Sequence, residues 1–150
     1  MATMTQIIHG DLLTTNTGCI AHQVNCQGVM GSGVAKQIRD KWPKLFEVYR
    51  NFCNQKNPYE LLGDCQLVFI EGFCVVNMFS QLNYGRGGLR YTDYNAFRSC
   101  CKILAQKIPC EQKISMPYGI GCGLGGGKWD VVFQIIEEEL RDHEILLYRL

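Results

Sequence analysis

Residues 117–130 read PYGIGCGLGGGKWD, and this stretch decides the class of fold. Within it, Gly121, Gly123 and Gly126 match the G-x-G-x-x-G spacing, which brings backbone N–H groups close to a phosphate at the start of a helix. An apolar, strand-like run precedes the stretch, and a pattern of helical period follows it. A single match of this kind is weak, so its interpretation depends on the rest of the chain.

The position of this motif argues against a classical dinucleotide-binding domain. Such a domain needs a second strand that ends in an acidic residue about 20 residues after the glycines. Only 24 residues follow Gly126, and Glu144 would begin the last strand rather than end it. We therefore expect the match to the dehydrogenase spacing to be coincidental.

Glycine clusters occur at three places, residues 28–33, 85–88 and 119–127, and each has the same context. Each follows a strand-like run and leads into a helical pattern. In an open α/β sheet, the loops at the carboxyl ends of the strands meet at one crevice. Glycine there lets the backbone approach a ligand, and a helix N-terminus adds partial positive charge. The pattern predicts a cleft for an anion, above all a pyrophosphate; the alternative, that the glycines only form tight turns, stays open.

Strand-length apolar runs alternate with helical patterns along the chain, which indicates a layered α/β fold with a mixed central sheet. We expect a two-residue hairpin at Glu71-Gly72 and a turn at Asn57-Pro58. The predicted strands cover residues 5–13, 19–24, 65–70, 73–79, 113–117 and 144–150, and the predicted helices cover residues 32–42, 45–54, 91–107 and 129–141.

Composition and charge fit one folded domain over residues 1–150, with 47% hydrophobic and 19% charged residues. The net charge of +1 gives no electrostatic case for binding DNA, RNA or an acidic membrane. No apolar run approaches the roughly 20 residues of a membrane span, and the first residues lack the layout of a signal peptide. We therefore expect a cytoplasmic protein with no membrane partner and no direct nucleic-acid binding.

The chain has nine cysteines, an odd number, and no C-x-x-C pair. This arrangement argues against a disulfide framework and against a zinc site. We expect reduced thiols that pack as small hydrophobic side chains. No cluster of histidines and carboxylates has the spacing of metal ligands, so we expect neither a metal nor a cofactor.

Four separated motifs together resemble a macrodomain, the ADP-ribose-binding module, and they occur in the order typical of that family. They are GDLL (10–13), IAHQVNCQGVMGSGVAKQI (20–38), VVNMFSQ (75–81) and MPYGIGCGLGGGKW (116–129). The resemblance implies a three-layer α/β/α fold, formed by residues 1–150 as a single macrodomain. It is closest to the branch of ADP-ribose-1″-phosphate phosphatases and of glycohydrolases that remove terminal ADP-ribose. His22, together with LLGDC and NMFSQLNYG, is more similar to the phosphatases.

The resemblance also implies roles for individual residues. Asp11 and Leu12 would contact the adenine, and Pro117 and Leu150 would pack against it. Asn25 and the loop 27–33 would surround the distal ribose, while backbone N–H groups of the loop 119–125 would wrap the diphosphate. The full set of implied ligand contacts adds Gln27, Met30, Gly31, Ser32, Gly33, Val34, Phe79, Ser80, Tyr84, Gly119, Ile120, Gly121, Cys122, Gly123 and Leu124.

The candidate catalytic residues are His22, Asn25 and Gln81. An unperturbed histidine has a pKa near 6.5, so His22 is the best group for proton transfer at neutral pH. The alternative is that His22 lies in the sheet interior and is hydrogen-bonded to backbone. The glycohydrolase branch has a lysine nucleophile where this chain has Gln81 and an aspartate where it has Gly125. Neither replacement supplies a nucleophile or a base, so that covalent route is not expected.

Three functions remain open, and all of them predict ADP-ribose or a derivative as the small-molecule ligand. The first is hydrolysis of ADP-ribose 1″-phosphate to ADP-ribose and phosphate. The second is removal of ADP-ribosyl esters from protein or nucleic acid, and the third is a non-catalytic reader of ADP-ribose. ADP-ribosylated macromolecules are additional partners in the last two. Tyr84 and Arg86 either form a flap over a distal phosphate, which an arginine fork suits, or belong to a solvated loop.

Overall fold

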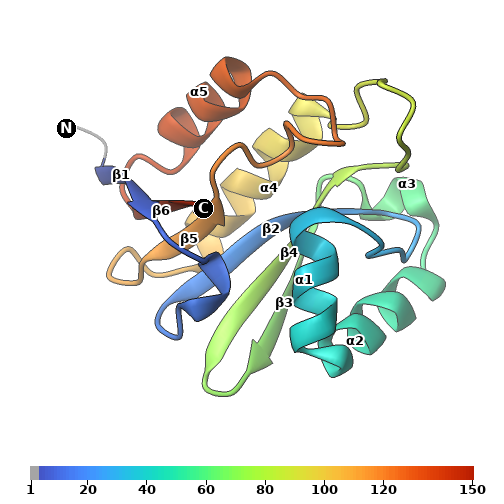
Figure 1. The fold of residues 1–150 in the computed structure, drawn as a ribbon, viewed down its shortest axis with the longest axis horizontal. Helices are drawn as coiled ribbons and strands as arrows, with labels where there is room; N and C mark the ends of the chain where they lie inside the picture. The colour runs from blue at the N-terminus through green and yellow to red at the C-terminus, as the bar shows by residue number, and fades with distance from the viewer. Residues whose placement is uncertain (1–3) are drawn as a thin grey trace.

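The computed structural model describes residues 4–150, which form a six-stranded sheet with helices on both faces (Figure 1). The strands are β1 (Met4–His9), β2 (Cys19–Asn25), β3 (Cys65–Ile70), β4 (Phe73–Gln81), β5 (Ile114–Pro117) and β6 (Glu144–Arg149). Their order in the sheet is β1-β6-β5-β2-β4-β3. Within residues 4–150, β3 pairs antiparallel with β4 and the other neighbouring strands pair in parallel, which confirms the predicted mixed sheet.

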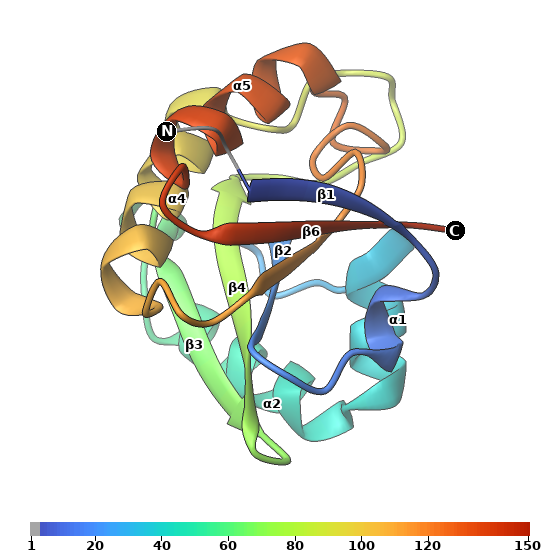
Figure 2. The same cartoon turned by 90° about the vertical axis from the view of Figure 1, so that its left-hand side faces the viewer.

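In the described part of the chain, five α-helices and one short 3-10 helix connect the strands. They are η1 (Leu12–Thr14), α1 (Gly33–Lys41), α2 (Pro43–Asn54), α3 (Pro58–Leu61), α4 (Tyr94–Lys107) and α5 (Trp129–Glu139). Helices α1 and α2 cover one face of the sheet, and α4 and α5 cover the other (Figure 2). This arrangement is the predicted three-layer α/β/α fold. Across the described residues, no helix combines the length and the apolar character that crossing a membrane requires.

Strand β2 lies inside the sheet and is buried on both faces. Cys19 and Ala21 pack in the core under α4 and α5, whereas Ile20 and Val24 pack in the core under α1 and α2. Side chains alternate between the two faces of a strand, so a strand that is covered on both sides reads as a continuous apolar run. Polar side chains within such a run have to find partners inside the protein.

The cysteines contribute to these two cores. All nine are free thiols, and six of them are buried. Cys19, Cys74, Cys100 and Cys101 belong to the core under α4 and α5, and Cys26 and Cys53 belong to the other core. The prediction that they pack as small hydrophobic side chains is confirmed for these six.

The first predicted strand is too long at its carboxyl end. The prediction covered residues 5–13, whereas β1 ends at His9. The reason is Asp11, whose carboxylate accepts a hydrogen bond of 2.9 Å from the backbone N–H of Leu13. This local bond caps η1 and competes with continuation of the strand.

Side-chain caps also explain two helix starts that differ from the prediction. The turn predicted at Asn57-Pro58 is the start of α3, where Asn57 and Glu60 form a capping box. Helix α4 begins three residues later than predicted. The carboxylate of Asp93 accepts a hydrogen bond of 2.9 Å from the N–H of Ala96, so Asp93 is the residue that caps the helix.

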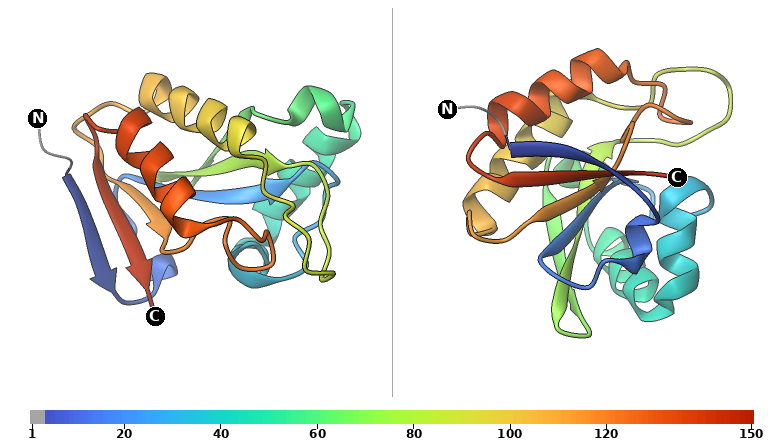
Figure 3. Two further views of the ribbon diagram at one scale, coloured as in Figure 1. Left: turned by 90° about the horizontal axis from the view of Figure 1, so that it is seen from above. Right: turned by 60° about the vertical axis from the view of Figure 1, so that its left-hand side comes forward.

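The three glycine-rich segments follow β2, β4 and β5 and lead into α1, α4 and α5. These three strands are parallel to one another, so their carboxyl ends lie at the same edge of the sheet. Figure 3 shows the three segments gathered on that side of the molecule. The predicted convergence of the glycine loops is therefore confirmed.

The two-residue hairpin between β3 and β4 is also confirmed, and it contains a strained residue. Glu71 has a φ of 51° and Gly72 a φ of 87°, both in the left-handed region. Glycine adopts this conformation at little cost, whereas a glutamate does not.

We expect Glu71→Asn to stabilise the protein by about 0.5 kcal/mol, because asparagine tolerates the left-handed region and Asn-Gly is favoured in such hairpins. Chemical unfolding of the two proteins measures the difference. Glu71→Ala serves as the control, since it removes the same side chain without relieving the strain. Equal stabilisation by alanine would contradict this explanation.

Candidate functional site

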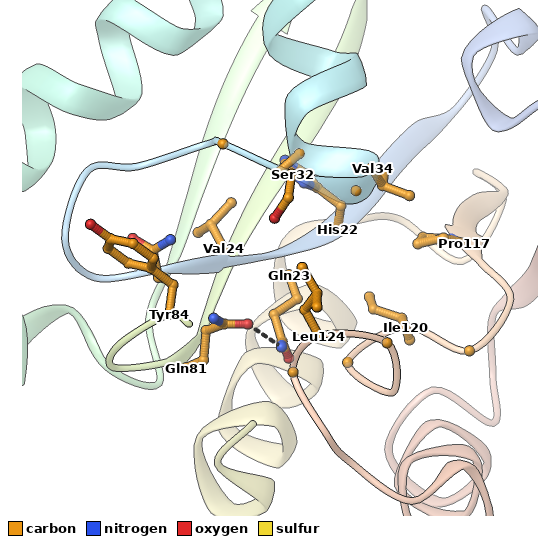
Figure 4. A pocket seen from close by; sticks show the side chains of 18 of the residues that line it. His22, Gln23, Val24, Ser32, Val34, Gln81, Tyr84, Pro117, Ile120 and Leu124 are labelled. Carbon is orange, nitrogen blue, oxygen red and sulfur yellow. Dashed lines mark hydrogen bonds between the residues drawn. The ribbon is translucent and has the colours of Figure 1, made fainter. Parts of the chain in front are cut away.

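The three glycine-rich loops line a single cleft at the carboxyl ends of β2, β4 and β5 (Figure 4). Its volume is about 440 Å³, within the range of about 300–1,000 Å³ that is usual for small-molecule sites. Ser32, at the start of α1, lies on one side of the cleft, and Ile120, in the loop after β5, lies on the other. Tyr84 and Pro117 lie at opposite ends, so the space is elongated.

Both sides of the cleft carry backbone N–H groups that have no hydrogen-bond partner among residues 4–150. On one side they belong to residues 33–35, the first turn of α1, where the helix itself supplies no acceptor. On the other side they belong to Gly121, Gly123 and Gly125. The first turn of α1 contains no acidic residue that would compete for its partial positive charge. The cleft therefore offers main-chain donors of the kind that bind anions.

The glycines after β5 serve two different purposes. Gly126 has a φ of 72°, and a Cβ atom there would lie 2.5 Å from the carbonyl oxygen of Leu89. This glycine is needed because the loop packs tightly against the segment before α4. Gly123 has no atom within 4 Å of a Cβ position and no left-handed backbone. Its bare backbone serves no packing purpose inside the protein, and it lines the cleft.

The side-chain amide of Gln23 on β2 joins the loops that form the cleft. Its nitrogen donates to Gln81 Oε1 at 2.6 Å and to Thr92 Oγ1 at 2.8 Å, and its oxygen accepts from the hydroxyl of Ser80 at 2.7 Å. Thr92 in turn donates to the carbonyl oxygen of Gly121 at 2.7 Å. One half-buried side chain thus connects β2, β4, the segment before α4 and the loop after β5.

The cleft has little side-chain charge. Arg86 is its only lining residue with a permanent charge, and its guanidinium has no ion-pair partner among residues 4–150. No carboxylate or lysine lines the cleft. Within the described part of the chain, no three His, Cys, Asp or Glu side chains gather as a metal site.

Curated relatives of this chain carry names that refer to ADP-ribose. An ADP-ribose 1″-phosphate phosphatase of Scheffersomyces stipitis is 37% identical over 73 residues, which cover 43% of this chain and 42% of the relative. A phosphatase of the same name from Meyerozyma guilliermondii is 26% identical over 169 residues, 93% of this chain and 94% of the relative. A DNA ADP-ribosyl glycohydrolase of Mycobacterium tuberculosis is 41% identical over 46 residues, 31% of this chain but 13% of the relative. The chain therefore spans less than half of the first of these relatives and a small part of the glycohydrolase. No family model matches.

Solved structures share the fold over the whole chain. A protein of unknown function from Bacteroides thetaiotaomicron has a TM-score of 0.87 at 33% identity, with 100% of both chains covered. The macrodomain of Mycobacterium tuberculosis DarG has a TM-score of 0.76 at 22% identity, covering 99% of each chain. Thermosipho africanus DarTG, solved in complex with ADP-ribose, has a TM-score of 0.80 at 19% identity over 96% of this chain and 41% of that chain.

The chain has the fold of a macrodomain. The names of its curated relatives refer to the phosphatases and glycohydrolases that the four sequence motifs resemble.

Within this macrodomain, His22 lies on the floor of the cleft but is 1% exposed. Its Nε2 atom is 2.6 Å from Oδ1 of Asn77 on β4. Burial lowers the pKa of His22 to about 4, and the hydrogen bond to Asn77 opposes this effect only in part. The imidazole is therefore neutral at pH 7 and is no proton donor there. This geometry favours the interior alternative, with a side-chain amide rather than backbone as the partner; a catalytic role for His22 stays a prediction.

The other two candidate catalytic residues line the cleft, but their amides have partners inside the protein. Asn25 accepts from the N–H of Gln27 at 2.9 Å and donates to the carbonyl of Val29 at 2.7 Å, so it holds the loop after β2 in shape. Gln81 accepts from Gln23 and donates to the carbonyl of Asn83 at 2.8 Å. Both side chains shape the walls of the macrodomain cleft.

The structure brings together eleven of the predicted ligand contacts and leaves eight outside the cleft. The lining residues are Gly31, Ser32, Gly33, Val34, Tyr84, Pro117, Gly119, Ile120, Gly121, Gly123 and Leu124. Asp11, Leu12, Gln27, Met30, Phe79, Ser80, Cys122 and Leu150 do not line it. Met30 and Phe79 are fully buried in the core under α1 and α2, and Leu150 is 90% exposed. The ligand roles of all these residues stay predictions.

Sequence reasoning missed several residues that line the macrodomain cleft. They are Gln23, Val24, Ala35 and Tyr118, and Arg86 was expected only as part of a flap. Gln23 had a usable signal, since it is a polar residue within a strand that is otherwise buried. Its partners on β4 and before α4 are 57 to 69 residues away in the sequence, so the signal did not identify them.

The burial of His22 predicts how the stability of the folded protein depends on pH. In the unfolded chain His22 has a pKa of 6.5, whereas in the folded protein its pKa is lowered to about 4. Between these values, lowering the pH favours the unfolded state, at a cost of about 1 kcal/mol for each pH unit. Unfolding measured from pH 7 to pH 4 should show a shallower loss of stability in His22→Gln than in wild type. His9→Gln, at an exposed site, should keep the wild-type slope; equal slopes for all three proteins would refute the burial effect.

Proposed function

We propose that this macrodomain binds ADP-ribose, with the diphosphate held between the first turn of α1 and the loop after β5. The observation that carries the proposal is two sets of backbone N–H groups without protein partners, those of residues 33–35 on one side of the cleft and those of Gly121, Gly123 and Gly125 on the other. Main-chain donors of this kind bind phosphate oxygens without needing lysine. The near-neutral net charge of the chain is therefore compatible with an anionic ligand.

The elongated shape of the cleft leaves one end for the distal ribose and the other end for the adenine. We place the distal ribose at the end of the cleft where Tyr84 lies, and the adenine at the end where Pro117 lies. A structural neighbour of the same fold was solved in complex with ADP-ribose. Asp11 lies outside the lining, so its predicted contact with the adenine requires the adenine to extend past Pro117.

Gly123→Ala tests the use of main chain for binding. The new Cβ meets no protein atom within 4 Å, so the fold should survive while the methyl group occupies the approach to the diphosphate. Calorimetric titration should show an affinity for ADP-ribose at least about tenfold weaker, equivalent to about 1.4 kcal/mol. Gly10→Ala is the matched control, since its Cβ is also free of contacts and lies outside the cleft. Equal affinities for both variants would contradict the diphosphate site, and no binding at millimolar ADP-ribose would contradict the proposal itself.

We further propose that the ligand is hydrolysed as ADP-ribose 1″-phosphate, the activity named in the phosphatase relatives. The supporting feature of this chain is Arg86, an unpaired cation in the loop that also carries Tyr84 at the ribose end. A guanidinium there would hold the terminal phosphate. Water attacks phosphorus, the bond between phosphorus and the ribose O1″ breaks, and O1″ receives a proton. Neutral His22 is the one lining group able to accept the proton of the water, and its low pKa predicts slow turnover.

The non-catalytic reader is the second candidate, and a specific observation favours it. The amides of Asn25 and Gln81 are engaged inside the protein, and His22 is a weak base. The covalent glycohydrolase route has no support, because Gln81 and Gly125 stand where that branch has its lysine and aspartate. Removal of ADP-ribosyl esters would need water positioned by the same loops.

Arg86→Gln distinguishes the phosphatase from the reader. We expect kcat/KM for phosphate release from ADP-ribose 1″-phosphate to fall about tenfold to a hundredfold, because the lost charge-assisted bond contributes about 1.5–3 kcal/mol. The affinity for ADP-ribose, which lacks the terminal phosphate, should change little. Arg90→Gln is the control, because Arg90 stacks on Tyr94 at 4.2 Å and does not line the cleft. If the wild-type protein binds ADP-ribose but releases no phosphate, the phosphatase proposal is contradicted and the non-catalytic reader remains.

A further inference from the structure

A row of three polar side chains crosses the sheet on the face that α1 and α2 cover. His22 on β2 lies opposite Asn77 on β4, and Asn77 lies opposite Gln66 on β3. The hydrogen bonds along the row measure 2.6 Å from His22 to Asn77 and 3.1 Å from Asn77 to Gln66. At the end of the row, the side-chain nitrogen of Gln66 donates to the backbone carbonyl of Val48 in α2 at 3.4 Å.

The carbonyl of Val48 sets the direction of every hydrogen bond in this row. A carbonyl only accepts, so the amide nitrogen of Gln66 must face it and the amide oxygen of Gln66 must face Asn77. Asn77 therefore donates with its nitrogen to Gln66 and presents its oxygen to His22. An oxygen needs a donor, so Nε2 of His22 carries the proton.

The other ring nitrogen of His22 is then an acceptor. In a neutral imidazole with the proton on Nε2, Nδ1 holds a lone pair and cannot donate. This atom is buried and has no hydrogen-bond partner among the protein atoms of the described residues. The ring itself lines the cleft close to the start of α1, where Ser32 and Val34 lie (Figure 4). A buried acceptor without a partner destabilises the folded protein, so such a group calls for an explanation.

We propose that Gln66 and Asn77 are positioning residues that hold His22 as its Nε2–H tautomer, so that Nδ1 accepts a hydrogen bond from a hydroxyl group on the cleft floor. The row makes His22 a fixed acceptor rather than a rotating or titrating group. Its neutrality at pH 7 follows from its burial.

The Nε2–H tautomer of His22 limits which ligand groups can bind at the floor of the cleft. This consequence rests on the proposed binding of ADP-ribose. A lone pair repels phosphate oxygens and attracts an O–H donor. The diphosphate therefore binds to the N–H groups of the two walls, and a ribose hydroxyl or a water molecule takes the position below α1. His22 discriminates between hydroxyl and phosphate at this position without changing its charge.

Proton–nitrogen NMR of the histidine rings tests the tautomer directly, because protonated and unprotonated ring nitrogens have well-separated resonances. The chain has three histidines, and loss of signals in His22→Gln assigns the ring. In the free wild-type protein we expect the proton on Nε2 and an unprotonated Nδ1. A proton on Nδ1 would overturn the proposal without any reference to a ligand.

Gln66→Leu tests the row. Without Gln66 the amide of Asn77 is free to turn its nitrogen toward His22, so we expect the Nδ1–H tautomer to become populated and the affinity for ADP-ribose to fall about fivefold, the effect of one hydrogen bond. Gln6→Leu, at an exposed position of the edge strand β1, should keep both the tautomer and the affinity of wild type. An unchanged tautomer in Gln66→Leu would remove Gln66 from the mechanism.

Titration with ADP-ribose identifies the donor. If a ligand hydroxyl binds, the Nδ1 resonance should move together with the backbone amide resonance of Gly123. Movement of the Gly123 amide alone would overturn the ligand contact and assign the acceptor to water, while the proposed binding would stand. If neither resonance moves, the proposed binding of ADP-ribose fails and the ligand contact fails with it; the tautomer is judged from the free protein.

Discussion

The hydrogen bonds of Gln23 are the interaction on which the shape of the cleft depends. Its amide lies at the carboxyl end of a buried parallel strand, where it joins β4 to the segment before α4 and, through Thr92, to the carbonyl of Gly121. The loop after β5 also accepts backbone hydrogen bonds from Tyr91 and Thr92 at the carbonyl of Gly125. Main-chain carbonyls of the loop are thus held on the protein side, while several of its N–H groups remain available to the cleft. A loop that used its N–H groups for internal packing would have nothing left with which to bind an anion.

Neighbouring residues of β2 serve the two faces of the sheet in different ways. Gln23 organises the wall under α4 and α5, and His22 belongs to the polar row under α1 and α2. Because the side chains of a strand alternate, two adjacent polar residues reach two separate networks that meet at the cleft. The consequence for function is a site rich in backbone donors and poor in reactive side chains. Such a site binds phosphate oxygens well, and its chemistry depends on the few lining side chains that keep a free polar atom, among them Arg86 and His22 with its Nδ1 atom.

The fold was largely predictable from the sequence because its signals are local. The hairpin at Glu71-Gly72, the buried character of β2 and the three glycine clusters after strands each depend on residues close together in the chain. The errors occurred where a single side chain competes with the regular pattern: Asp11 ends the first strand region, and Asn57 turns a predicted turn into a short helix. The site was predicted less completely. Convergence of the loops followed from strand direction, whereas the partners of Asn25, Gln81 and Gln23 did not follow from any spacing.

The sequence alone determined the order of strands and helices, the family resemblance and the expectation that backbone amides form the cleft, because period, glycine placement and apolar runs are properties of short segments. Only the tertiary structure decided which polar atoms remain free. His22 shows why: its place in the family motif and its usual pKa suggested a proton-transfer group. Asn77, 55 residues away, instead occupies Nε2, and burial holds the ring neutral. Whether a polar atom is available for chemistry depends on the neighbours that the fold brings to it, and those neighbours are distant in the chain.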